Sequence, residues 1–149
     1  MWLAFHDDFA DPKSADPVLR QSSRVQAAGA LHPQFTYDVP QWEQAIGVPV
    51  QRFTPFDPAF YGLKTMEEVN SPKGLAIRRD VDMRAWITRD DPPILMISRL
   101  PDTTPTSPGH LYHHPRHVQL IHKRLEELGM VNEVYLPALN KPAKPGETA

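Results

Sequence analysis

The chain has 149 residues, a net charge of −2, a sequence pI near 6.4 and no cysteine. This composition excludes disulfides, thiolate nucleophiles and cysteine-type zinc sites, and it lacks the basic surface of a nucleic-acid-binding protein. No stretch is long and apolar enough to span a membrane, and the apolar opening at residues 1–5 is too short for a signal peptide, so we expect a cytoplasmic protein.

The first 61 residues predict one strand and one short helix among loops. Prolines in residues 7–17 stop any helix there, whereas residues 24–31 form a mostly apolar run that predicts a strand. Residues 39–47 carry a proline near the start and a glycine at the end, which predicts a short helix. In residues 48–61 aromatic residues alternate with prolines, which predicts a packed cap without long regular structure.

The middle of the chain predicts two short helices and a second strand. Residues 65–69 have the spacing of a capping box and predict one helical turn that ends before Pro72. Residues 80–88 show near-helical spacing and predict a single short helix. The apolar run at residues 94–97 predicts a strand, followed by a loop that contains Asp102.

The last third predicts the best-defined helix, a third strand and a tail. Pro115 suits a first helical position, and apolar residues recur at helical spacing up to residue 128. Residues 131–136 predict a strand, and the proline-rich residues 140–149 predict a disordered tail. We therefore expect one partial α/β domain over residues 1–139, a small three-layer parallel sheet with flanking helices, with Asp102 beyond the carboxyl end of a strand.

Several segments resemble the carboxyl-terminal half of α/β-hydrolase esterases and lipases. The resemblance is carried in the second half by residues 90–98, 101–102, 109–115, 124–129 and 133–136, and in the first half by residues 8–12, 16–18, 20–25 and 34–38. It covers nearly the whole chain but only half of the family's domain. It implies an ester hydrolase that uses a serine nucleophile, a histidine base and an acid on a small-molecule ester, without a cofactor.

The resemblance implies that Asp102 is the acid that holds the catalytic histidine. The glycine-flanked serine of the family is absent, since neither Ser22-Ser23 nor Ser98 has flanking glycines, and no histidine follows the last predicted strand. We therefore expect a truncated or split carboxylesterase or lipase-like module with no esterase activity of its own. An exposed aspartate in a turn next to proline is the alternative interpretation of Asp102, because aspartate is common in turns.

Two further hypotheses come from other features of the sequence. Four histidines (His110, His113, His114 and His117) form a cluster in which His113 and His117 have the i, i+4 spacing that can hold zinc or nickel, with Asp102 as an oxygen ligand. This favours a metal-dependent hydrolase as an alternative, although clustered loop histidines are usually solvated. Alternatively, a partial sheet leaves edges and apolar faces that favour a non-catalytic, self-associating module, such as a dimer. Glycine-rich phosphate loops are absent, and a flavodoxin-like or response-regulator-like module is the alternative fold.

Overall fold

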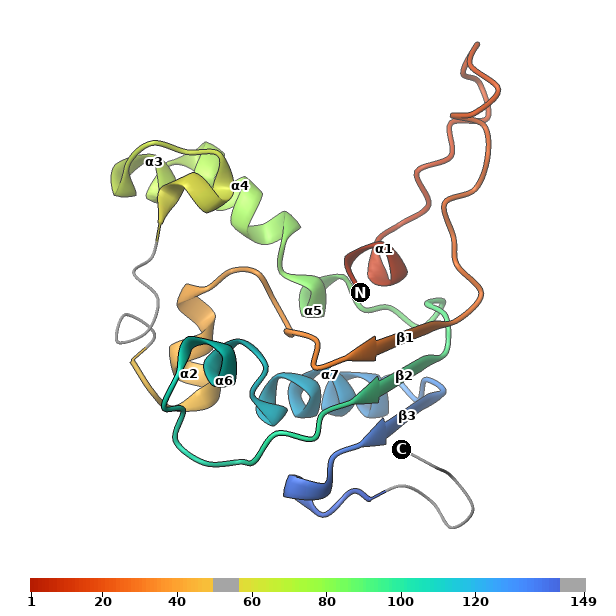
Figure 1. Cartoon of the computed structure of the whole chain (residues 1–149). Helices are drawn as coiled ribbons and strands as arrows, with labels where there is room; N and C mark the ends of the chain where they lie inside the picture. The colour runs from red at the N-terminus through yellow and green to blue at the C-terminus, as the bar shows by residue number, and fades with distance from the viewer. Residues whose placement is uncertain (50–56, 143–149) are drawn as a thin grey trace.

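The computed structural model, which describes residues 1–49 and 57–142, contains a three-stranded parallel sheet (Figure 1). Its strands are β1 (Ala28–Leu31), β2 (Ile94–Ile97) and β3 (Asn132–Tyr135), in the spatial order β1-β2-β3. Ala28 is in register with Ile94, and Ile94 with Asn132. The prediction of an α/β fold with a small parallel sheet is confirmed.

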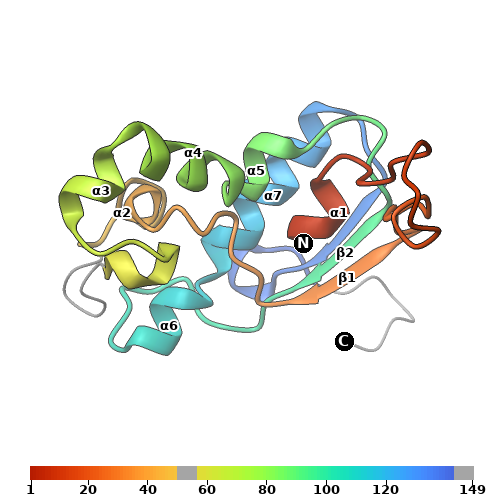
Figure 2. The ribbon, with the colours of Figure 1, turned by 90° about the horizontal axis from the view of Figure 1, so that it is seen from above.

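Helix α7 (Pro115–Glu127) is the main cover of the sheet. Its stripe of Val118, Ile121 and Leu125 is fully buried and joins Ile94 and Met96 of β2 in one core cluster. Burying each such side chain stabilises the fold by about 1.5–3 kcal/mol. Helices α1 (Trp2–Phe5) and α5 (Met83–Trp86) lie on the same side of the sheet as α7 (Figure 2).

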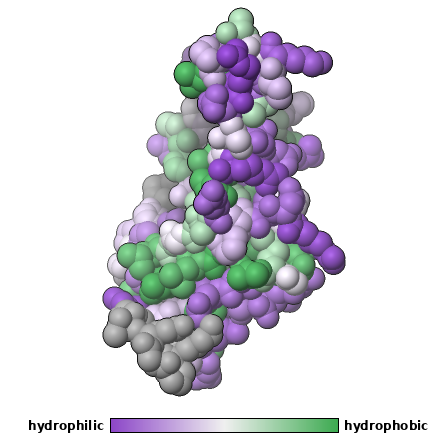
Figure 3. Space-filling view, turned by 90° about the vertical axis from the view of Figure 1, so that its right-hand side faces the viewer, coloured by the Kyte–Doolittle hydropathy of each residue, from purple (hydrophilic) through white to green (hydrophobic). Residues whose placement is uncertain are grey.

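The other face of the sheet is not covered by any helix of the described residues, so the predicted third layer is wrong for this part of the chain. Side chains alternate along a strand, and Gly29, Leu31 and Leu95 are exposed there, with Leu31 at 69% and Leu95 at 44%. We call this surface the open face. The strand order supplies the reason, because right-handed crossovers between successive neighbouring strands place every helix on one side. Hydrophobic residues also run across the side of the molecule drawn in Figure 3.

Helices α2 (Pro40–Ile46) and α6 (Pro108–Tyr112) lie beyond the carboxyl ends of the strands (Figure 1). The predicted helix at residues 39–47 is confirmed, and Gly47 ends it in the left-handed conformation with φ of 81°. Three further short helices, which we call the cap, follow the undescribed residues 50–56, which contain part of the predicted aromatic segment: η2 (Pro58–Tyr61), α3 (Met66–Asn70) and α4 (Pro72–Asp80).

The short helix predicted at residues 80–88 is present but shorter, as the one-turn α5 that starts at Met83. The preceding α4, which ends at Asp80, was not predicted. Pro72 begins α4 at its first position, with Ser71 as the N-cap whose hydroxyl accepts from the Gly74 amide. The helical turn predicted at residues 65–69 is confirmed as α3, with Thr65 as the N-cap whose Oγ1 accepts from the Glu68 amide at 3.2 Å. The Glu68 carboxylate accepts from the Lys64 amide at 2.6 Å, one residue before the position of a complete capping box.

The chain beyond β3 turns back on itself. Helix η3 (Pro137–Leu139) leads to Asn140 in the left-handed conformation, and Lys141 forms backbone hydrogen bonds with Leu136. The predicted tail therefore begins with three residues that belong to the fold, while residues 143–149 lie outside the described residues. No helix of the described segments has the length and apolar character to cross a bilayer.

Candidate functional site at the carboxyl edge of the sheet

The loops that leave β1 and β2 bring several polar side chains to the carboxyl edge of the sheet. His32 follows β1 directly, Ser98 follows β2 directly, and Asp102 lies further along the second loop. In parallel sheets this edge is where ligands and catalytic groups are usually placed. The position of Asp102 after β2 is therefore as the sequence predicts.

Asp102 is held by an arginine. The Arg116 Nε donates to Asp102 Oδ1 at 2.8 Å, and Arg116 Nη2 approaches Oδ2 at 3.4 Å. The same guanidinium donates from Nη1 to the carbonyl oxygen of Ile46, at 2.9 Å, so it joins the β2–α6 loop to the end of α2. This fork geometry is typical of a structural arginine–carboxylate pair.

The histidine nearest to Asp102 is His114, but both of its ring nitrogens form hydrogen bonds with backbone groups. His114 Nε2 lies 3.6 Å from Asp102 Oδ1 and donates instead to the Thr103 carbonyl oxygen at 3.1 Å. Its Nδ1 accepts the Arg116 amide and caps α7. Burial lowers the pKa of His114, so its neutral form is favoured. Both ring nitrogens have structural partners, and the pair does not have the arrangement of a triad acid and base.

A cavity of about 390 Å³ lies at the end of β1. Its lining includes Leu31, His32 and His113 together with Met1, Trp2 and Met83. His32 Nδ1 lies 3.1 Å from the hydroxyl of Ser98, which is fully buried, and His113 Nδ1 lies 3.0 Å from the carbonyl oxygen of His32. Burial, followed by the charges of His113 and Arg99, lowers the pKa of His32.

The four histidines of the predicted metal cluster do not meet at one point, although the rings of His110 and His114 stack with their centroids 5.3 Å apart. Each bonds to a different backbone carbonyl: His110 to Pro101, His113 to His32, His114 to Thr103 and His117 to Leu111. Within residues 1–49 and 57–142, no group of three or more His, Asp or Glu side chains is arranged to hold a metal ion. The clustered-histidine zinc or nickel site is therefore not formed, because these rings connect separate segments of backbone.

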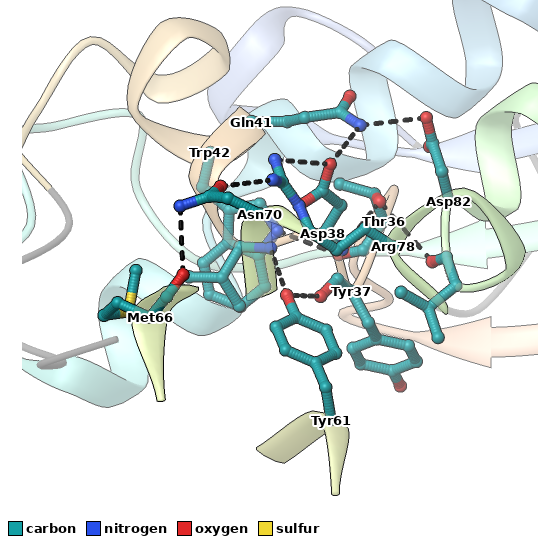
Figure 4. Close-up of polar contacts among 12 residues, drawn as sticks. Thr36, Tyr37, Asp38, Gln41, Trp42, Tyr61, Met66, Asn70, Arg78 and Asp82 are labelled. Carbon is teal, nitrogen blue, oxygen red and sulfur yellow. Dashed lines mark hydrogen bonds and ion pairs between the residues drawn. The ribbon is translucent and has the colours of Figure 1, made fainter. Parts of the chain in front are cut away.

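A polar network anchors the cap to the carboxyl edge (Figure 4). The Asp38 carboxylate, just before α2, accepts from Arg78 Nε of α4 at 2.7 Å and from the Gln41 amide at 3.0 Å. The same Gln41 amide donates to Asp82 Oδ2, and the Tyr61 hydroxyl donates to the Tyr37 carbonyl oxygen at 2.8 Å. Asp38 is buried and fully paired, which is the arrangement of a structural network.

Reasoning from the sequence missed two residues that organise this edge, Arg116 and His32. Arg116 follows Pro115 in the first turn of α7, where no local pattern indicates that it reaches back to Asp102. His32 is a non-glycine residue with φ of 48°, a conformation that the sequence does not reveal. The strand prediction at residues 24–31 did place His32 at a strand end, and this was the available signal.

No protein-family model, curated protein or solved structure matches this chain. The hydrolase resemblance thus has no support from these comparisons, and it continues as a prediction from sequence motifs.

Proposed function

We propose that this chain is one half of an α/β-hydrolase-type carboxylesterase or lipase-like module. Its sheet would be completed by a further strand and helices, and the chain alone would not hydrolyse esters. The observation that carries the proposal is the sheet of the described residues, in which no strand pairs with the outer edge of β1 and the open face exposes Leu31 and Leu95.

The outer edge of β1 is suited to pairing with another strand. Ala28 donates its amide to Pro93 and His32 donates to Ile97, and alternate residues of a parallel strand face the same neighbour. The backbone groups of Gly29 and Leu31 therefore point away from β2. Lysine, proline and bulges, which usually protect an exposed edge, do not occur in β1.

The opposite edge of the sheet is different. Beyond β3, Leu136 and Lys141 exchange backbone hydrogen bonds of 2.6 Å and 3.0 Å, so the chain folds back at the carboxyl end of that strand. The two edges are therefore not equivalent, and the one at β1 is the better template for strand addition.

The path of the chain before β1 also favours completion at this edge. Met1 and Trp2 line the same cavity as His32, at the carboxyl end of β1, and the chain then passes through α1 to reach the amino end of β1. Such a path would suit the second part of a crossover connection from a strand parallel to β1. A nucleophile placed ahead of α1 would lie beside this cavity, as the resemblance implies.

A direct test compares esterase activity in two preparations. The 149-residue chain should hydrolyse p-nitrophenyl butyrate at the buffer rate. A longer chain, extended in frame upstream of Met1 by a segment with a glycine-flanked serine, should hydrolyse it, and Asp102→Asn should lower kcat in that longer chain. The matched control Asp90→Asn removes an exposed ion pair with Arg24 and should leave kcat unchanged. Hydrolysis by the 149-residue chain, or an upstream sequence without such a serine, would contradict the proposal.

The second candidate function is self-association through the open face. The exposure of Leu31 and Leu95 on one surface favours it, because contiguous apolar surface commonly marks an interaction site. In that case two copies would cover each other's open faces, and the chain would act as a binding module without chemistry.

A further inference from the structure

We propose that His32 and His113 form a two-histidine site for a divalent transition metal ion such as Zn²⁺ or Ni²⁺. The site would lie in the cavity at the carboxyl end of β1. This inference uses neither Asp102 nor an added segment, although it concerns the cavity beside which the esterase proposal places its nucleophile.

The hydrogen bond of His113 determines which of its nitrogens can bind a metal. A carbonyl oxygen only accepts, so the 3.0 Å contact between His113 Nδ1 and the His32 oxygen places the proton on Nδ1. The Nε2 of His113 therefore has a lone pair. Histidine ligands in metal sites almost always donate their other ring nitrogen in this way.

His32 has the same arrangement in one of its tautomers. With its proton on Nδ1, it donates to the buried Ser98 hydroxyl at 3.1 Å and leaves the Nε2 lone pair available. His32 is half-buried and lines the cavity. A metal ion would select this tautomer.

The two rings lie at a separation suited to a shared ion. Their centroids are 6.0 Å apart with an interplanar angle of 66°, and both rings line one cavity of about 390 Å³. That volume leaves room for water or a small ligand at the remaining coordination positions, as in metal sites with open positions. His32 is also held at φ of 48°, an uncommon conformation for a residue other than glycine, and such conformations cluster at functional sites.

The other histidines of the predicted cluster use the opposite ring nitrogen for their hydrogen bonds to carbonyl oxygens. His110, His114 and His117 contact carbonyl oxygens through Nε2, so their protons lie on Nε2 and their lone pairs on Nδ1. The His114 Nδ1 is already bonded to the Arg116 amide, and the His117 ring is fully buried.

Imidazole suits zinc, nickel and copper. A site with two histidine ligands binds a metal ion more weakly than the three or four protein ligands of zinc sites do.

Calorimetric titration of the whole chain with Zn²⁺, and absorption spectroscopy with Co²⁺, test the proposal. We expect one ion per chain, and His113→Gln should weaken binding at least about tenfold. His32→Asn should do the same, since asparagine tolerates the left-handed conformation. Ser98→Ala should also weaken binding although both histidines remain, because it removes the hydroxyl that orients His32. Unspecific binding of Zn²⁺ to surface histidines would not depend on Ser98.

The matched controls are His110→Gln and His122→Gln, which should bind Zn²⁺ as the unaltered chain does. Circular dichroism establishes that each variant is folded, and if His32→Asn is not, His113→Gln and Ser98→Ala decide the question. The proposal is overturned if the unaltered chain does not bind Zn²⁺, if His113→Gln binds equally well, or if a control loses binding.

Discussion

At the scale of single residues, His117 gives the clearest pH dependence. Its ring is fully buried between Phe35 and Trp42, and burial lowers its pKa from 6.5 to about 4. The unfolded chain takes up this proton below pH 6.5, whereas the folded chain does so only near pH 4. The stability from neutral His117 is therefore complete above pH 6.5 and is lost as the pH falls towards 4.

This shift corresponds to about 3 kcal/mol of unfolding free energy lost between pH 7.5 and pH 4. Urea denaturation followed at several pH values measures it. His117→Leu should remove most of this dependence of the unfolding free energy on pH. A smaller dependence should remain, because the pKa values of His32 and His114 are also lowered. An equal slope in both proteins would show that His117 is not the group responsible.

The Asp102–Arg116 pair supports a second prediction at this scale. Asp102→Asn should lower the free energy of unfolding by about 1 kcal/mol, because the carboxylate is partly buried while its arginine partner is more exposed. Asp90→Asn, whose carboxylate is mostly exposed, should change it by less than about 0.5 kcal/mol. Urea titration compares them, and equal effects would mean that the arginine fork does not stabilise the β2–α6 loop.

At the scale of elements, the cap depends on close packing of α3 against α4. A β-carbon added at Gly74 would overlap the backbone oxygens of Glu68 and Val69, which cannot move aside as a flexible side chain would. Gly74→Ala should therefore destabilise the protein by about 1–3 kcal/mol. Gly109→Ala is the matched control, since it also lies in a short helix and its β-carbon would meet nothing within 4 Å.

Amide hydrogen exchange identifies which elements Gly74→Ala destabilises. The cap has its own small core of Tyr61, Leu63 and Val69, separate from the core under α7. We therefore expect faster exchange in α3 and α4 with little change in α7. Uniformly faster exchange along the whole chain would show instead that the cap and the sheet unfold together.

At the scale of the whole molecule, the second candidate function predicts that the open face determines whether the chain is a monomer or a dimer. If two copies associate through it, Leu95→Lys should shift the molecular mass measured by light scattering towards the monomer, because a charge would be buried in the contact. Leu75→Lys changes a residue of similar exposure on α4, away from the sheet, and should leave the mass unchanged. A monomer at all concentrations in the unaltered chain would exclude this candidate function.

The sequence by itself determined the elements whose signals are local. The stripe of Val118, Ile121 and Leu125 between Pro115 and Gly129 predicted α7, and short apolar runs predicted all three strands, because side-chain spacing follows directly from helix and strand geometry. The same patterns placed Asp102 in the loop after β2.

Only the tertiary structure decided what those residues contact. Asp102 is held by Arg116, and the nearby His114 bonds to other groups. The clustered histidines bond to separate carbonyl groups, and His32 approaches His113 across 81 positions of sequence. The open face, which no helix of the described residues covers, likewise depends on strand order, and one strand's own pattern does not specify that order. Contacts between distant segments follow from how the chain crosses from strand to strand, and that handedness acts on whole elements rather than on residue spacing.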